Sequence, residues 1–207
     1  MQKNQYSNLM NKPDSKIKLY NALNNTYASK KKQKKAFVNQ GYVYDSDLSN
    51  HEHQVYFNPN EKKLLYTVKG TNMFSPKDIG TDLYLAFGHL KDTNRFKQEK
   101  STLEKARKKY NPSNTTVSGH SLGMSLSQYI AGKNDKVVGL DGGATIGQKM
   151  RSNTTAYRTS GDAVSLMNAN SKRMTTLKNP NITTGILPLD VLNAHNVSNI
   201  KQNKIYI

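Results

Sequence analysis

Short apolar runs of strand length alternate along this chain with stretches that have helical spacing. Runs rich in β-branched and large apolar residues predict five strands, at 54–57, 63–68, 115–117, 136–140 and 154–158. Between the second and third of these runs, the charged segment 96–110 predicts a helix that ends before Asn111-Pro112. Strands separated by helical segments are typical of an α/β fold with a mainly parallel central sheet flanked by helices.

The N-terminal part predicts one further helix, within about residues 13–36. It starts after the Pro13-Asp14-Ser15 segment and carries apolar side chains on one face. Those side chains are Ile17, Tyr20, Leu23 and Tyr27. The helix is predicted to end in the lysine-rich segment 30–35, since positive charge suits the negative end of a helix dipole. No Pro/Gly/Ser-rich linker divides the 207 residues, so we expect one domain over 1–207.

The composition is polar and strongly basic. Hydrophobic residues make up 35% of the chain and the mean hydropathy is −0.78, which suffices for one sheet with flanking helices. Lys and Arg number 31 against 14 Asp and Glu, a formal net charge of +17. Such a field favours anionic partners, of which a membrane surface is the first candidate. Nucleic acid is a weaker candidate, because Lys far outnumbers Arg and no RNA-binding motif, zinc finger or phosphate-binding Gly-Lys loop is present. Plain solubility would explain the same charge.

The absence of cysteine excludes disulfides, thiolate metal sites and a cysteine nucleophile. His51 and His53 flank Glu52 without metal-site spacing, so we expect both to be solvated and expect no metal and no cofactor. The first residues lack the apolar core of a secretory signal, and no apolar run is long enough to cross a bilayer. A cytoplasmic or particle-associated location is therefore expected in preference to classical secretion.

The most specific motif covers residues 119–123, which read Gly-His-Ser-Leu-Gly. A predicted strand precedes this G-x-S-x-G pentapeptide, and a run with helical spacing follows it. That context predicts a nucleophile elbow, a sharp strand-to-helix turn that exposes the Ser121 hydroxyl at the carboxyl end of the strand. The alternative is an ordinary tight turn of small residues.

A serine nucleophile needs a base to take its proton and an acid to orient that base. In enzymes with this elbow, the acid and then the histidine follow the serine along the chain. His195 is the only histidine after Ser121. Asp141 and Asp162 both come just after a predicted strand, and Asp190 is a weaker candidate for the acid. His120 adjoins the serine and is expected to point elsewhere.

When a serine hydroxyl attacks a carbonyl group, the negative charge that develops on the carbonyl oxygen needs two backbone N–H donors. Leu122 supplies one by its place in the elbow. Gly70-Thr71, which follows the strand at 63–68, is the candidate for the second. An ordinary strand exit would look the same.

Several segments together resemble the class 3, fungal triacylglycerol lipase-like, branch of the α/β-hydrolases. They are 66–71 with 78–83, 117–123, 157–164 and 195–200. Met124 stands where this family usually has a second glycine, so we expect the helix after the elbow to pack less closely on its neighbouring strand.

The resemblance implies an α/β-hydrolase fold and the hydrolysis of carboxylic esters, with lipid esters as the substrate class. It assigns Ser121 as nucleophile, His195 as base and Asp162 as orienting acid, because the family's acid lies two strands beyond the nucleophile. The amides of Thr71 and Leu122 would form the oxyanion hole. The competing hypothesis is a catalytically inactive protein that keeps the hydrolase scaffold and binds an anionic membrane or nucleic acid through its basic surface.

Overall fold

The computed structural model describes residues 15–70, 90–143, 149–168, 171–179 and 193–207. A single sheet runs through this part of the chain, with its strands in the order β1-β2-β3-β4-β5-β6-β7. The strands are β1 (Val43–Tyr44), β2 (His53–Asn58), β3 (Lys63–Val68), β4 (Asn114–His120), β5 (Lys136–Leu140), β6 (Thr154–Thr159) and β7 (Met174–Leu177). β1 and β2 are antiparallel to their neighbours, and β3 to β7 are parallel. The predicted α/β architecture with a mainly parallel sheet is confirmed.

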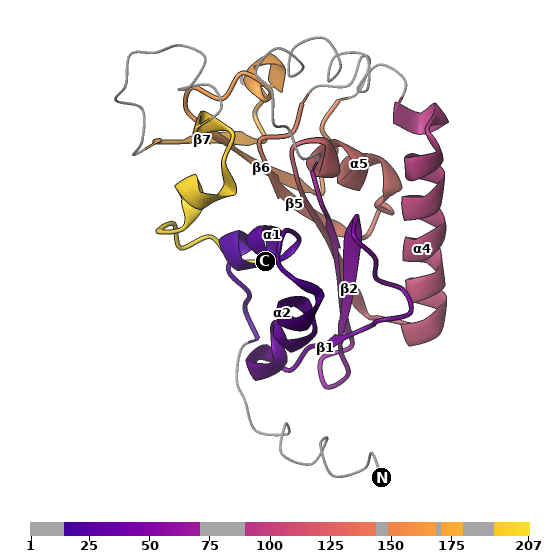
Figure 1. Cartoon of the computed structure of the whole chain (residues 1–207). Helices are drawn as coiled ribbons and strands as arrows, with labels where there is room; N and C mark the ends of the chain where they lie inside the picture. Colours follow the sequence, from indigo (N-terminus) through magenta and orange to yellow (C-terminus); the bar gives the residue numbers. More distant parts are fainter. Residues whose placement is uncertain (1–14, 71–89, 144–148, 169–170, 180–192) are drawn as a thin grey trace.

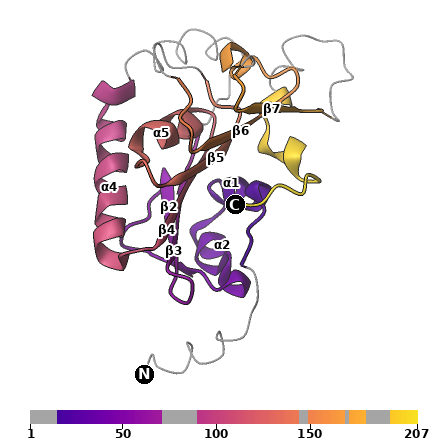
Figure 2. The same ribbon diagram turned by 180° about the vertical axis from the view of Figure 1, so that it is seen from behind.

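Helices cover both faces of the sheet. α4 (Asn94–Tyr110) and α5 (Leu122–Ile130) lie on one face, as Figure 1 shows and Figure 2 repeats from behind. α1 (Leu19–Asn25), α2 (Lys30–Lys35) and the 3-10 turn η5 (Val197–Ile200) lie on the other. The remaining 3-10 turns are η2 (Val38–Gln40), η3 (Leu90–Asp92) and η4 (Leu166–Asn168).

Successive side chains of a strand point to opposite faces of the sheet, so a strand made largely of apolar residues contributes to an apolar core on each face. In β5, Val137 joins the cluster under α4 and α5, while Val138 and Leu140 pack against α1 and η5. Strands buried on both faces read as continuous apolar runs, which is why the sequence predicts them well. The two strands that the sequence does not predict lie at the sheet edges. β1 has two residues, and β7 is largely exposed, so neither carries an apolar pattern.

The single helix expected within 13–36 is two helices. α1 places Leu19 and Leu23 on the sheet, and the chain turns before α2 begins. Gln33 is the buried residue of α2, and its amide donates to the Ala28 carbonyl at 3.0 Å. A helix with lysine on nearly every exposed position therefore docks through one polar side chain rather than an apolar face.

α4 ends at its predicted residue, begins at Asn94 rather than at residue 96, and is capped at both ends. The Thr93 side chain accepts the Phe96 amide at 3.1 Å, and Asn111 ends the helix in a left-handed conformation. Leu103 and Ala106 bury its apolar face. A polar contact in its second turn adds to this apolar packing.

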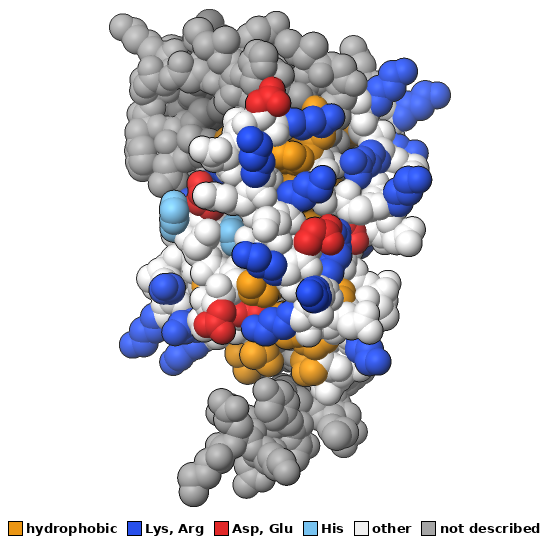
Figure 3. Space-filling view, turned by 90° about the vertical axis from the view of Figure 1, so that its right-hand side faces the viewer, with side chains coloured by type: hydrophobic (Ala, Val, Ile, Leu, Met, Phe, Trp, Pro, Cys, Tyr) orange, Lys and Arg blue, Asp and Glu red, His pale blue; other side chains and the backbone are white. Residues whose placement is uncertain are grey.

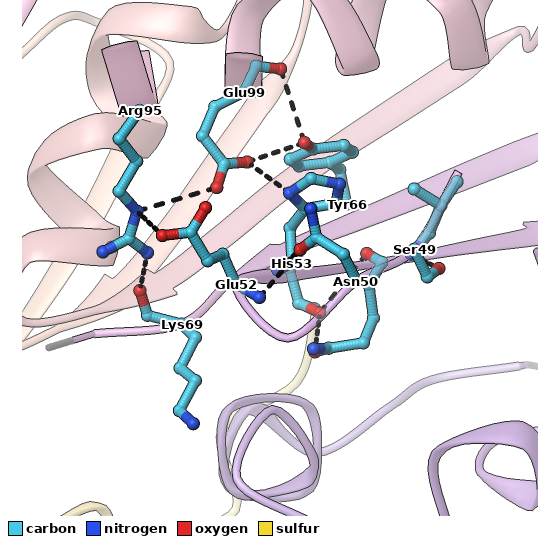
Figure 4. A network of polar contacts seen from close by, with 12 residues as sticks. Ser49, Asn50, Glu52, His53, Tyr66, Lys69, Arg95 and Glu99 are labelled. Atoms are coloured by element: carbon cyan, nitrogen blue, oxygen red, sulfur yellow. Dashed lines mark hydrogen bonds and ion pairs between the residues drawn. The ribbon is translucent and has the colours of Figure 1, made fainter. Parts of the chain in front are cut away.

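Glu99 of α4 is fully buried and forms the centre of a polar network against β2 and β3 (Figure 4). Tyr66 donates its hydroxyl proton to Glu99 Oε2 at 2.7 Å, and His53 Nδ1 lies 3.0 Å from the same oxygen. The expectation that His53 is solvated is wrong, because only 3% of this residue is exposed. A carboxylate at this depth is tolerated because neighbouring groups donate to it.

The same network fixes the chain where it leaves β3. Arg95 Nε lies 3.8 Å from Glu99 Oε1 and 3.5 Å from Glu52 Oε1, and its Nη2 donates to the Lys69 carbonyl at 2.5 Å. Gly70 follows directly, and a Cβ added there would lie 3.1 Å from Ser121 Cβ. Arg95, paired with Glu99 and Glu52, thus holds the exit of β3 beside the serine through the Lys69 carbonyl.

α5 lies unusually close to β3 and β4. A Cβ added at Gly123 would lie 2.3 Å from the Val68 carbonyl oxygen, and one at Gly119 would lie 2.3 Å from the Gly123 carbonyl. The looser packing expected from Met124 is not found. Its side chain is buried over Gly139 of β5, where an added Cβ would meet Met124 Sδ at 2.1 Å, so a glycine on the strand makes room for it.

The surface that carries α4 shows basic side chains spread over its length, with few acidic ones between them (Figure 3). The exposed lysines of this helix are Lys97, Lys100, Lys105, Lys108 and Lys109. Among the described residues, no helix has the length and apolar character needed to span a bilayer.

Replacement of Glu99 by alanine should lower the free energy of unfolding by about 2–4 kcal/mol, because the Tyr66 hydroxyl and His53 lose their buried partner. Glu104→Ala is the matched control, since this glutamate of the same helix has a side chain that is 58% exposed. It should change stability by less than about 0.5 kcal/mol. Urea unfolding of both variants measures the difference, and equal effects would show that the network does not hold α4.

Gly123→Ala should destabilise the protein by at least about 1–3 kcal/mol, because the added carbon overlaps the Val68 carbonyl. Gly132→Ala serves as control, as its nearest neighbour would be the Asp135 carboxylate at 3.4 Å, an ordinary contact. Thermal unfolding of the two variants should separate them clearly. Equal melting temperatures would contradict the close packing of α5.

Candidate active site

Ser121 occupies the turn between β4 and α5, as the motif predicts. Its φ of 56° and ψ of −128° lie outside the regions that residues with a side chain ordinarily adopt. Two backbone hydrogen bonds keep Ser121 in this strained conformation. The Ser121 amide donates to the Leu140 carbonyl at 3.0 Å, and the Met124 amide donates to the Ser121 carbonyl at 3.0 Å. Strained serines of this kind cluster at functional sites.

Asp162 and His195 are brought together from positions 33 residues apart. Asp162 lies in the turn after β6, and its Oδ1 is 2.7 Å from His195 Nδ1. The other oxygen, Oδ2, accepts the Ser165 amide at 2.8 Å and also the Ser165 hydroxyl. Ser165 therefore fixes the Asp162 carboxylate, and the carboxylate fixes the orientation of the His195 ring.

The electrostatics of this pair favour a charged acid beside a basic imidazole. Burial works to raise the pKa of Asp162, but the hydrogen bond and positive charge of His195 and the Ser165 donors hold this pKa below its usual range. Burial also works to lower the pKa of His195, but the hydrogen bond to Asp162 and its charge raise this pKa above the ordinary value. An imidazole in this setting can accept a proton and keep it.

His195 Nε2 and Ser121 Oγ are both buried, and neither has a hydrogen-bond partner within the described ranges. The residue before the serine does approach His195, since the rings of His120 and His195 lie 4.8 Å apart between centroids. Catalytic hydrogen bonds in ligand-free enzymes are often longer than in the reacting complex.

His120 does not point away from the site, so that expectation is wrong. Its ring is buried against His195, and its Nδ1 lies 3.0 Å from the Tyr27 hydroxyl oxygen. Burial, and next the nearby charge of His195, lower the pKa of His120 to about 3. His120 is therefore a neutral imidazole at physiological pH.

Asp141, the other acid considered from the sequence, lies at the end of β5 and has a positive φ of 51°. It accepts the Thr159 amide at 2.6 Å and the Thr159 hydroxyl at 3.1 Å. Burial and the charge of Asp162 raise the pKa of Asp141 to about 7. The two acids therefore differ in environment, and Asp162 is the one hydrogen-bonded to His195.

The predicted oxyanion donors are described in part. Leu122 is the first residue of α5, so its amide has no acceptor within the helix. Thr71 and Asp190 lie outside the described residues. The backbone before Thr71 lies beside the nucleophile, since a Cβ added at Gly70 would lie 2.7 Å from the His120 carbonyl oxygen.

A set of possible metal ligands was missed by sequence reasoning. His120, Asp141 and His195 each offer one ligand atom, and these atoms lie within 4.8 Å of one another. The only signal in the sequence is that His120 ends β4 and Asp141 directly follows the parallel neighbour β5. The residues are far apart in the sequence, and no local spacing marks them.

Comparison with known proteins places the fold. No protein-family model matches the sequence, and no curated protein is detectably similar to it. Among solved structures, a mutant form of MDLA from Penicillium cyclopium is 12% identical and has a TM-score of 0.50, with 80% of this chain and 79% of that chain covered. A structure described as a fungal lipase is 12% identical with a TM-score of 0.49, covering 83% and 81%. Lip2 lipase from Yarrowia lipolytica is 16% identical with a TM-score of 0.36, covering 54% and 53%.

At sequence identities this low, similarity to solved structures is evidence for the fold only. The strand order, the strained serine between β4 and α5, and the similarity to MDLA over most of both chains agree with one another. The chain has the α/β-hydrolase fold that its sequence predicts.

Proposed function

We propose that the protein is a serine hydrolase that cleaves carboxylic esters, with lipid esters as its substrate class. The observation that carries the proposal is the 2.7 Å hydrogen bond between Asp162 and His195, formed beside the strained turn that holds Ser121. Position in an α/β-hydrolase fold supports the same roles for these three residues. The lipid part of the proposal rests on the resemblance of the motifs to class 3 lipases.

In the proposed reaction, Ser121 Oγ attacks the ester carbonyl carbon while His195 Nε2 takes the hydroxyl proton. Asp162 holds the Nδ1–H of the ring and stabilises the imidazolium that forms. The amides of Leu122 and Thr71 would donate to the oxyanion. Collapse of the tetrahedral intermediate breaks the ester bond, and His195 returns the proton to the leaving alcohol. Water then attacks the acyl-enzyme while His195 takes its proton, the bond to Ser121 Oγ breaks to release the carboxylic acid, and His195 returns the proton to Oγ.

The reaction requires the site to open. Ser121 has no exposed surface, so the exposure of its hydroxyl predicted from the motif is not found, and an ester must gain access to it before reaction. A buried donor or acceptor without a partner costs about 1–3 kcal/mol. Ser121 Oγ and His195 Nε2 are both in this condition among the described residues, and one hydrogen bond between them would satisfy both. That gain favours the geometry that proton transfer needs.

Neutral His120 suits this mechanism. A second imidazolium 4.8 Å from the His195 ring would oppose the charge that His195 gains when it takes the serine proton. Because the pKa of His120 is lowered to about 3, His120 carries no such charge under ordinary conditions.

Ser121→Ala should abolish hydrolysis of p-nitrophenyl butyrate and labelling by a fluorophosphonate probe, with a loss in kcat of about 10³-fold or more. The melting temperature should not fall, because the hydroxyl makes no hydrogen bond within the described part of the chain. Ser101→Ala, at an exposed position on α4, is the matched control and should keep full activity and labelling. Activity that survives in Ser121→Ala would exclude the proposed nucleophile.

The two buried acids can be told apart by their amides. Asp162→Asn should lower kcat by about 10³- to 10⁴-fold, because an asparagine amide cannot hold the required tautomer of His195. Asp141→Asn should cost at least about 100-fold less, because Asp141 is hydrogen-bonded to Thr159 rather than to His195. Rates measured in the presence of a chelator decide between them, and the reverse order would make Asp141 the orienting acid.

The competing hypothesis, an inactive scaffold that binds anionic surfaces, makes a different set of expectations. Wild-type protein would be inert to esters and to the fluorophosphonate probe. Its binding to anionic vesicles or nucleic acid would weaken steeply with salt and would be unaffected by Ser121→Ala. The basic surface alone is compatible with both hypotheses, since it would also concentrate an esterase on anionic lipid.

A further inference from the structure

We propose that His120, Asp141 and His195 form a binding site for a divalent transition metal ion such as Zn²⁺, and that the bound ion inhibits hydrolysis by occupying His195 Nε2. The binding site stands on its own geometry. The inhibition rests on the proposed function, because it concerns the atom that would accept the serine proton.

The ligand set of this cluster suits Zn²⁺. Two imidazoles and one carboxylate are a common donor set for Zn²⁺ and leave a fourth position for water. His120 ends β4, Asp141 directly follows the parallel neighbour β5, and His195 comes just before η5. Their ligand atoms lie within 4.8 Å of one another. Zn²⁺ bonds of about 2.0–2.2 Å would require these atoms to move closer together.

The orientation of the two histidine rings also fits a metal site. His195 Nδ1 is bonded to Asp162, and His120 Nδ1 lies 3.0 Å from the Tyr27 hydroxyl oxygen. In metal sites, the ring nitrogen that does not bind the ion usually donates to a carboxylate or another oxygen, which fixes the tautomer. Asp162 and Tyr27 are in the right places to act as these outer partners.

The Nε2 atoms of His120 and His195 also favour a bound ion. Both are buried, and neither has a hydrogen-bond partner within the described residues. Two unsatisfied imidazole nitrogens in one buried cluster are rare, because a buried polar atom ordinarily has a partner. A metal ion would satisfy both at once, and the carboxylates of Asp141 and Asp162 would balance its charge.

Inhibition follows from the shared nitrogen. The Nε2 lone pair of His195 either coordinates a metal ion or receives the Ser121 proton, and it cannot do both. His120 and Asp141 bind only in the metal-loaded state, so their removal should separate metal binding from hydrolysis. Each variant is compared with its own metal-free rate.

Binding is tested with Co²⁺, whose visible absorption reports coordination without reference to activity. Chelator-treated wild-type protein should bind one equivalent of Co²⁺, and Zn²⁺ should displace it. His120→Gln and Asp141→Asn should each lower the affinity by about 10- to 100-fold or more. His51→Gln, at an exposed histidine, is the matched control and should bind like the wild type, as should Ser121→Ala. Absence of a one-to-one Co²⁺ complex would overturn the site, as would full affinity in His120→Gln.

Inhibition is tested with the fluorophosphonate probe. Saturating Zn²⁺ should slow labelling of Ser121 by about tenfold or more in the wild type, and a chelator should restore it. Labelling of His120→Gln should be insensitive to the same Zn²⁺ concentration. Equal Zn²⁺ inhibition in His120→Gln would overturn the mechanism.

Two readouts keep the proposals distinguishable. If Co²⁺ binds but no labelling occurs in any condition, the hydrolase proposal fails and the metal site stands. If the variants fold poorly, histidine NMR of the wild type replaces them. Zn²⁺ should then shift the resonances of His120 and His195 and leave those of His51 in place, and shifts confined to His51 would refute the site.

Discussion

The close approach of α5 to the ends of β3 and β4 is the constraint on which the site depends. Gly119 and Gly123 allow this approach, since a side chain at either position would overlap backbone atoms. The turn between strand and helix is consequently too tight for ordinary dihedral angles, and Ser121 takes a positive φ. The strain is local, but the packing that imposes it extends across three strands, so the serine has little freedom to relax.

Buried polar groups then place the remaining elements around that turn. On one side, Glu99 anchors α4 to β2 and β3, and Arg95 from the same helix holds the Lys69 carbonyl where β3 ends. On the other side, Ser165 fixes Asp162, and Asp162 fixes His195. Both networks lie in a low-dielectric interior, where a satisfied ionic group is rigidly positioned and an unsatisfied one is costly. Apolar packing stabilises the fold but is not directional, whereas these polar contacts fix the positions of particular groups.

The parts of the molecule that sequence predicts are those with local or periodic signals. The central strands are buried on both faces, α4 has a cap at each end, and the serine turn has a glycine on each side. Chain order left more than one acid open, and the resemblance to class 3 lipases assigned Asp162, which the structure pairs with His195. The edge strands lacked any apolar pattern, and the break between α1 and α2 depends on the amide of Gln33 finding the Ala28 carbonyl. No pattern in the sequence reports contacts of that kind.

His120 shows why the site contains more than its sequence motif reveals. His120 is the variable position before the serine in the G-x-S-x-G motif, so the motif assigns it no role. The alternation of side chains along β4 predicts which face of the sheet it lies on, but not which residues it contacts. Its ring direction is set by Tyr27, which comes from the segment after α1, and by His195 near the C-terminus. A neutral imidazole held in this way stabilises the site only if its free nitrogen finds a partner. The same holds for His195, whose free nitrogen can serve a proton or a metal ion but not both. The cluster lies next to the strained serine and holds two histidine nitrogens without partners among the described residues. Occupation of these nitrogens by a proton or by a metal ion would therefore decide whether His195 can act as a base.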